Sequence, residues 1–175
     1  MRMVLLGLAA AILTACSNLP LTGKASEDVV CPDVLIVPDA GTLVLFTVGG
    51  GPDLTDAVLL GQMRNFSGNC VTQASEGRLV LDMTARIGLE KGPAHTGAPA
   101  SFSYFVAVVR KDGTLLNKAV FESEVTFGES NVMTAVEELE QIIPLADLST
   151  AGQLSVLIGF QLTPEQLEYN RLRGG

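Results

Sequence analysis

Only a few side chains in this sequence are of the types that carry catalysis or bind metal. The single histidine among the 175 residues, His95, lies in the Gly- and Pro-rich segment 92–99, with no cysteine close to it in sequence. Serine triads need a histidine as base, and most zinc sites need several His or Cys ligands. We therefore interpret His95 as a solvated loop residue, and we expect no catalytic residue, no metal ligand and no cofactor.

Three glutamates, Glu137, Glu138 and Glu140, are candidates for acid–base chemistry. If their segment is a β-strand, Glu138 and Glu140 share one face, where paired carboxylates could act in hydrolysis or bind calcium. A run of acidic residues is more often a solvated face, and no further set of ligands accompanies this one. A carboxylate-dependent hydrolase is therefore an alternative hypothesis and not the leading one.

Three consecutive glycines at 49–51 invite comparison with a phosphate-binding loop. Such a loop continues with Lys and then Ser or Thr, which this run does not, and Asp53 and Asp56 follow instead. The two carboxylates would repel phosphate. We interpret the glycines as a turn.

The N-terminus has the three parts of a secretory signal. Arg2 is followed by an uncharged apolar segment at 4–13 and by the small residues Thr14 and Ala15. The apolar segment is too short to span a bilayer as a helix, which takes about 20 residues. We expect residues 1–15 to be removed on export.

The four residues at 13–16, Leu-Thr-Ala-Cys, resemble the lipobox of bacterial lipoproteins. This resemblance implies that Cys16 starts the mature chain, with its sulfur diacylated and its amino group acylated, for example by palmitate. Several acyl chains hold a protein in a membrane almost permanently. Ser17, where Asp would imply retention at the inner membrane, implies the periplasmic face of the outer membrane, with the inner membrane as the alternative. Residues 16–30 are polar and contain Pro and Gly, and they predict a lipidated tether.

Export would place Cys31 and Cys70 in an oxidising compartment, where disulfides persist. Because the chain has three cysteines and Cys16 is expected to be lipidated, only one pairing is available. A metal site or a reactive thiol is the alternative, but no His or Cys partner lies near either residue in sequence. We predict a disulfide, whose loop of about 40 residues would stabilise the fold by roughly 4 kcal/mol.

The net charge of −8 comes from 19 acidic and 11 basic residues, and the basic ones do not cluster in the sequence. This balance argues against nucleic acid as a partner and against attachment to anionic lipid by long-range charge. The expected partners are the membrane, through the anchor at Cys16, and an envelope protein.

Alternation with a period of two dominates the chain after Cys31 and predicts β-strands. Apolar and mostly polar residues alternate at 79–89 and again at 115–127, whereas 102–109 is apolar on both faces, as a central strand is. An Asp-Gly pair between the last two segments suits a tight turn. We therefore expect 101–127 to form one antiparallel hairpin whose inward stripe shares a buried core with the stripe at 79–89.

Further strands are expected at 42–48, 57–73 and 153–162. Segment 131–145 fits either a helix or a strand, and we favour the strand because its surroundings are β. These elements predict one domain at 31–175 with an antiparallel β-sandwich of about seven strands, Ig-like or fibronectin-like, and a short C-terminal helix. A small β-barrel is the alternative.

Thr163 and Gln166, with a proline directly after the threonine, form a capping box that predicts a helix at about 164–172. The segment 159–171, together with 104–107, resembles a stretch in alphaproteobacterial envelope lipoproteins that have no assigned activity. If the helix does more than close the fold, four side chains expected to be exposed form its candidate partner surface: Gln166, Tyr169, Asn170 and Arg171.

The leading functional hypothesis is a non-enzymatic, lipid-anchored envelope protein that binds or scaffolds another envelope component. It combines the predicted permanent anchor with a β-sandwich scaffold. A carrier of a lipophilic ligand is one alternative, which a large apolar cavity in the β domain would favour. The carboxylate-dependent hydrolase is the other, which a deep pocket containing two acids of raised pKa would favour.

Overall fold

The computed structural model describes residues 30–174. The predicted signal at 1–15, the lipidated Cys16 and the tether up to residue 29 lie outside the described residues and stay predictions. No helix in the described range is long and apolar enough to cross a membrane.

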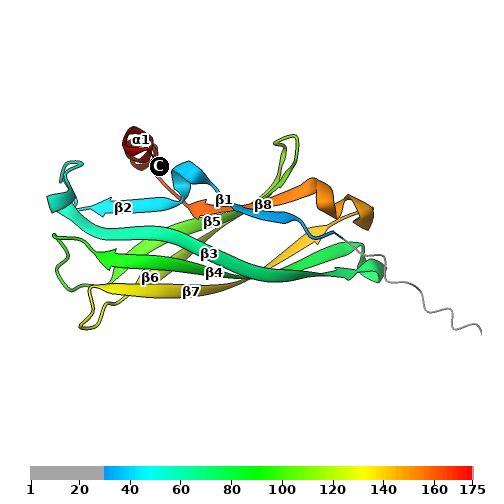
Figure 1. Ribbon diagram of the computed structural model, residues 1–175, viewed down its shortest axis with the longest axis horizontal. Helices are drawn as coiled ribbons and strands as arrows, with labels where there is room; N and C mark the ends of the chain where they lie inside the picture. The colour runs from blue at the N-terminus through cyan, green and yellow to red at the C-terminus, as the bar shows by residue number, and fades with distance from the viewer. Residues whose placement is uncertain (1–29, 175) are drawn as a thin grey trace, which may run out of the picture.

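The described residues form eight strands in two four-stranded sheets, and the strands run along the length of the molecule in Figure 1. Sheet A contains, in order across it, β1 (Asp33–Ile36), β8 (Leu154–Phe160), β5 (Ala100–Arg110) and β6 (Leu115–Val125). Sheet B contains β2 (Thr42–Phe46), β3 (Ala57–Gln73), β4 (Arg78–Lys91) and β7 (Val132–Pro144). The remaining elements are the 3₁₀ helices η1 (Pro38–Ala40), η2 (Leu54–Asp56), η3 (Ala74–Glu76) and η4 (Leu148–Gln153), and the α-helix α1 (Pro164–Arg173). The predicted β-sandwich is confirmed, and the alternative of a small closed barrel is wrong.

The sequence analysis does not predict β1, which is the additional strand. β1 has four residues and follows Cys31 almost directly, so its alternation is too short to detect. It pairs in parallel with β8, with Asp33 opposite Ser155. Every other strand pair in the described range is antiparallel, so the sandwich is mixed at this one edge.

β4 supplies the centre of the core. Its inward positions, every second residue of 79–89, are all apolar and each is at most 4% exposed. They form one continuous cluster with the inward side chains of β5 and β8. This stripe is confirmed as buried, because leaving a large apolar side chain in water costs about 1.5–3 kcal/mol.

Segment 131–145, which is ambiguous in sequence, contains the strand β7, as we favoured. It pairs with β4 along its whole length, from Val132 opposite Glu90 to Pro144 opposite Arg78. Leu139 and Ile143 point inward and are buried. The neighbouring edge of β4 therefore decides between helix and strand, which the segment's own pattern leaves open.

β5 and β6 form the predicted hairpin, with Gly113 at φ +88° in its turn, a conformation that favours glycine. One part of the expectation for β6 is wrong, because its inward stripe is not buried throughout. Val125 is 5% exposed, but Leu115 at the other end is 57% exposed and Asn117 is exposed as well. A bulge in the β5–β6 pairing places Leu115 opposite Val109, on the outer face of sheet A. Asn117 keeps its inward position opposite Val108, but it lies where the space between the sheets is open.

The C-terminal helix α1 begins with the predicted capping box. The backbone N–H of Gln166 donates to Thr163 Oγ1 at 3.3 Å, and the backbone N–H of Thr163 donates to Gln166 Oε1 at 2.8 Å. The helix packs on η1 and β2. There, Asn170 Nδ2 donates to the carbonyl oxygens of Asp39 and Thr42, each at 2.9 Å.

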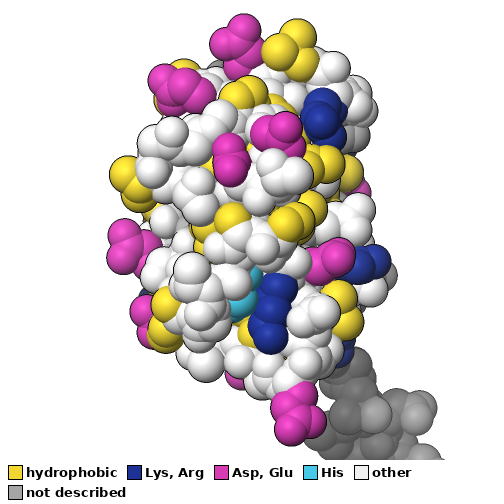
Figure 2. Space-filling view, turned by 90° about the vertical axis from the view of Figure 1, so that its left-hand side faces the viewer, with side chains coloured by type: hydrophobic (Ala, Val, Ile, Leu, Met, Phe, Trp, Pro, Cys, Tyr) yellow, Lys and Arg dark blue, Asp and Glu magenta, His cyan; other side chains and the backbone are white. Residues whose placement is uncertain are grey.

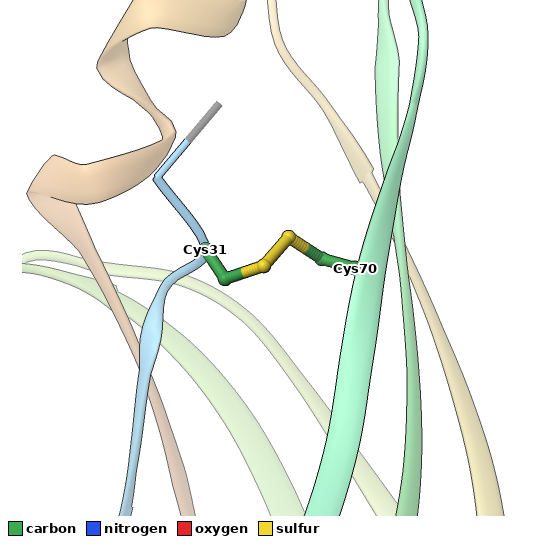
Figure 3. Close-up of a disulfide and its surroundings, with 2 residues drawn as sticks. All are labelled: Cys31 and Cys70. Carbon is green, nitrogen blue, oxygen red and sulfur yellow. A yellow bond between two sulfur atoms is a disulfide. The ribbon is translucent and has the colours of Figure 1, made fainter. Parts of the chain in front are cut away.

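The predicted disulfide between Cys31 and Cys70 is present (Figure 3). Cys31 precedes β1 of sheet A, and Cys70 lies in β3 of sheet B, with the two Cα atoms 5.8 Å apart. The bond therefore fixes the point at which the described chain enters the sandwich. That point lies toward the right-hand side of Figure 1, and we call this end of the molecule the entry end.

Candidate functional site

Among the described strands, β6 and β7 are the free edges of their sheets on the same side of the sandwich. Glu137 of β7 bridges the two edges. Its Oε1 accepts a hydrogen bond from Ser123 Oγ at 2.9 Å, and its Oε2 accepts one from Tyr104 Oη at 3.1 Å. We call Glu137, Ser123 and Tyr104 the edge clasp. An inward charge of this kind also discourages an edge strand from pairing with another chain.

The hydrogen bonds of the edge clasp connect the two sheets and have a structural role. Tyr104 is 2% exposed and stacks on Phe121, with the ring centroids 5.2 Å apart. Burial, and then the neighbouring Glu137 carboxylate, raise the pKa of the Tyr104 hydroxyl, so it stays protonated and donates. A carboxylate beside a serine can act as a base, but both Glu137 oxygens are already engaged in bonds between the sheets.

Beyond the clasp, toward the entry end, the two free edges part and a groove opens between them. Its volume is about 1070 Å³, and it runs from the β5–β6 turn to the connection between β7 and η4. Its apolar lining consists of Val108, Leu116, Ile142, Ile143, Pro144, Leu145, Ala146 and Leu154. Small-molecule sites have volumes of about 300–1,000 Å³, so this groove matches the largest of them.

Four charged side chains also line this groove: Arg110, Lys111, Asp112 and Asp147. The backbone N–H of Thr114 donates to Asp112 at 2.9 Å, and the hydroxyl of Ser149 donates to Asp147 at 2.7 Å. These bonds hold the pKa of both carboxyl groups below the usual range. The two basic side chains make no ion pair with any residue in the range 30–174. A hydrogen-bonded carboxylate keeps its negative charge, so the rim combines two basic and two acidic side chains and has no net charge.

Exposed apolar side chains also occur at the entry end, and two of them line the groove. Val71 and Ile142, with Val80 between them, are neighbours across β3, β4 and β7 on the outer face of sheet B. Val71 is 50% exposed and Ile142 is 46% exposed, while Leu116 on the opposite lip of the groove is 43% exposed. Val30, next to the disulfide, is 70% exposed. We call Val30, Val71, Leu116 and Ile142 the entry-end patch.

The end of the sandwich opposite the entry end faces the viewer in Figure 2 and contains His95. The His95 ring meets the edge of Phe127, with centroids 5.3 Å apart, and within the described residues neither of its enclosed ring nitrogens has a hydrogen-bond partner. Lys91 Nζ, over the same phenyl ring, donates to the carbonyl oxygen of Gly128 at 3.1 Å. Our expectation of a solvated His95 is wrong, because the loop packs its ring against Phe127.

A hollow of about 470 Å³ adjoins His95, with Glu90, Lys91 and Asn131 among its lining residues. Figure 2 shows acidic, basic and apolar side chains interspersed over this end, without a broad patch of one kind. No group of three or more His, Cys, Asp or Glu side chains in residues 30–174 is arranged to hold a metal ion.

Glu138 and Glu140 lie on the outer face of sheet B, on the one shared face that strand spacing predicts, and both are exposed. Glu140 is opposite Asp82 of β4, so like charges face each other across neighbouring strands. Neither glutamate lines the groove. The glycine run forms the predicted turn, with Gly49 at φ +80°.

The four residues of the predicted partner surface on α1 mostly hold the helix in place. Asn170 is 5% exposed, so its expected exposure is wrong: it is buried because it bonds two backbone carbonyls. Arg171 Nε pairs with Asp39 Oδ2 at 2.8 Å. Gln166 belongs to the capping box, and the Tyr169 ring lies edge-on to Phe46 with centroids 5.3 Å apart.

Sequence reasoning misses both the inward direction of Glu137 and the groove. The sequence does indicate the inward direction of Glu137. It is separated from Leu139 and Ile143 by an even number of residues, so strand alternation places it on the same face as these two buried side chains. The groove has no comparable signal. It depends on the angle at which two edges, distant in sequence, approach each other.

Fold and site together define the molecule as a β-sandwich with an open groove between its edge strands β6 and β7. No protein-family model, curated protein or solved structure matches the chain.

Proposed function

We propose that this protein is a lipid-anchored envelope lipoprotein with a non-catalytic role, and that it binds another envelope component in the groove. The observation that carries the proposal is the groove itself, a hollow of about 1070 Å³ at the entry end. Concave sites with a mostly apolar lining and a few well-placed charged groups are the usual form of ligand sites. The groove combines these features, with a buried apolar floor and with two basic and two acidic side chains at its rim.

The predicted lipid anchor at Cys16 also supports the proposal. The lipobox-like sequence at 13–16 would attach the chain to a membrane through Cys16. The roughly 14 residues between Cys16 and Val30, as a flexible chain, have a root-mean-square reach of about 20 Å. The disulfide holds the start of the domain at the same end as the groove. The groove would then work close to the membrane surface, on the periplasmic face of the outer membrane.

Two double variants test whether binding depends on the groove. Leu116→Glu with Ile142→Glu places two charges on the lips of the groove. Val120→Glu with Val132→Glu places the same charges elsewhere on the same two strands. All four side chains are 43–59% exposed, so each variant keeps the core intact.

The full-length lipidated protein and both variants are extracted from the native membrane in mild detergent, and bound lipid and protein are identified by mass spectrometry. We expect the component that copurifies with the wild type to be lost from the groove variant and kept by the control variant. Equal retention by both variants would contradict binding in the groove.

A further inference from the structure

A second concave surface lies beside the C-terminal helix. It is a hollow of about 530 Å³ between α1 and the glycine turn at 49–51, and it shares no lining residue with the groove. This corner of the molecule lies toward the top of Figure 2, where acidic and apolar side chains adjoin. We propose that the hollow binds a basic segment of another protein, one that presents an apolar side chain next to Lys or Arg. The inference adds a separate surface to the proposed function and does not depend on what the groove binds.

The walls of the hollow are mostly apolar. Phe46 of β2 and Tyr169 of α1 are half-buried, with their rings edge-on to each other, and Pro52 follows the glycine turn. Leu172 lies on the outer side of α1 and is 82% exposed, so the described residues leave most of it uncovered. The glycines opposite have no side chains to fill the space. An apolar side chain of a partner would remove Leu172 and the two rings from water, and that removal drives binding.

The charged side chains around the hollow are mostly acidic. Glu165 and Glu168 line it and are exposed, and Arg173 is the basic side chain in the described lining. Two more carboxylates follow the glycine turn. Asp53 comes directly after the lining residues of that turn, and Asp56 accepts a hydrogen bond from its backbone at 3.2 Å. Four carboxylates therefore surround a single guanidinium in this part of the described chain.

The basic residues of α1 do not neutralise this corner. The guanidinium of Arg173 lies over the Tyr169 ring, 5.0 Å from its centroid, and can offset one carboxylate. Arg171 is already paired with Asp39 at 2.8 Å. The corner therefore has a net negative charge, and a partner cation beside the hollow would be complementary to it.

The polar atoms around the hollow are mostly hydrogen-bond acceptors. Bonds from the backbone and hydroxyl of Thr55 lower the pKa of the Asp53 carboxyl, and bonds from its own N–H and from Thr163 lower the pKa of the Glu165 carboxyl. Both groups are therefore charged at neutral pH. The carbonyl oxygens of the two glycines in the lining accept no hydrogen bond from any residue in the range 30–174. Lys and Arg side chains have only donors, so they match such a set of acceptors.

Two other occupants fit this hollow less well. A second copy of the chain would bring a further net charge of −8 to a corner that is already negative. A membrane surface lies, by the predicted anchor, at the entry end on the right-hand side of Figure 1, whereas α1 and β2 lie toward the left. A basic protein segment is the occupant that the charge favours.

Short synthetic peptides with a fluorescent label test this inference on the full-length lipidated protein in phosphatidylcholine vesicles. The first peptide has a leucine between two lysines. The second has glutamates in place of the lysines, and the third has glycine in place of the leucine. We expect saturable binding of the first peptide alone, measured by fluorescence anisotropy against vesicles without protein. Its affinity should fall as the salt concentration rises.

A pair of matched glycine variants locates the binding of this peptide. Gly51→Arg should abolish it, because the new side chain places both bulk and positive charge in the hollow. A Cβ atom added at Gly51 has no heavy atom within 4 Å, and the same is true at Gly128, so Gly128→Arg is the control that should bind normally. Thermal unfolding of both variants checks that the fold is unchanged.

A pair of matched charge variants tests the selectivity. Glu165→Gln with Glu168→Gln should weaken binding of the first peptide roughly threefold to tenfold. Glu138→Gln with Glu140→Gln removes two exposed charges from sheet B and should leave binding unchanged. Equal losses within either matched pair, or equal binding of the three peptides, would overturn the inference. Self-association of the protein that Gly51→Arg abolishes would assign the hollow to a second copy and would overturn it as well.

Discussion

Glu137 differs from its neighbours Glu138 and Glu140 because it points between the sheets. Its two oxygens accept the only hydrogen bonds found for the Tyr104 and Ser123 hydroxyls in the described chain. Replacement by alanine would leave these hydroxyls without a partner in a partly buried site. We expect Glu137→Ala to lower the free energy of unfolding by about 1–3 kcal/mol, measured by urea denaturation.

Two variants make the Glu137 result specific. Glu137→Gln keeps an acceptor and should lose less stability than the alanine variant. Glu138→Ala removes an exposed carboxylate from the adjacent position and should stay within about 0.5 kcal/mol of the wild type. If Glu137→Ala and Glu138→Ala lowered the free energy of unfolding equally, the edge clasp would contribute nothing to stability.

Tyr104 gives the fold a dependence on alkaline pH. Burial raises the pKa of its hydroxyl in the folded state above the value of about 10 expected in the unfolded chain. This contribution to stability is complete below about pH 10 and is lost as the pH rises toward the folded-state pKa. We expect the unfolding free energy to fall above about pH 10, and Tyr104→Phe to flatten this decline. Identical alkaline profiles for the two proteins would refute the assignment.

At the scale of elements, the disulfide is the strongest single constraint between the sheets. It closes a loop with a sequence separation of 39 residues. In the loop-entropy model this is worth about 4 kcal/mol, because the cross-link restricts the unfolded chain. We expect the double variant Cys31→Ser, Cys70→Ser to unfold at a correspondingly lower denaturant concentration. Treatment of the wild type with a thiol reductant should reproduce the shift, and no change on reduction would disagree with this prediction.

Most strands are predictable from the sequence because their inward positions repeat over many residues. The stripe at 79–89 is apolar at every inward position, and the hairpin at 101–127 has its turn residues in place. β1 is not predictable, since four residues cannot establish a period and its partner β8 is more than 100 residues away in sequence. β7 is ambiguous until its pairing with β4 is known.

The candidate site is less predictable than the fold. Arg110 ends β5, and Asp112 and Asp147 are ordinary turn residues in sequence; nothing in their spacing places the three around one groove. Asn117 and Gln141 are polar residues at inward positions of the edge strands β6 and β7. Whether the two sheets pack together at such positions or leave a groove between them depends on how the sheets twist against each other.

At the scale of the whole molecule, the anchor determines where the groove works. Replacement of Cys16 by serine removes the sulfur that the lipobox resemblance expects to be diacylated. We expect Cys16→Ser protein to lack the acyl chains and to keep its uncleaved signal, as seen by the mass of the chain. A variant that still sediments with membranes and matures normally would show that the lipoprotein reading is wrong.

Photo-crosslinking in the native membrane tests most directly whether the groove at the entry end is the binding site. A photoreactive amino acid replaces Leu116 on the lip of the groove in one protein and Val120, on the same strand, in another. The two side chains are 43% and 52% exposed, so they are matched in accessibility. We predict a discrete product with a lipid or envelope protein from position 116 and none from position 120. Products from position 120 alone, or equal products from both, would contradict the groove as the site of binding.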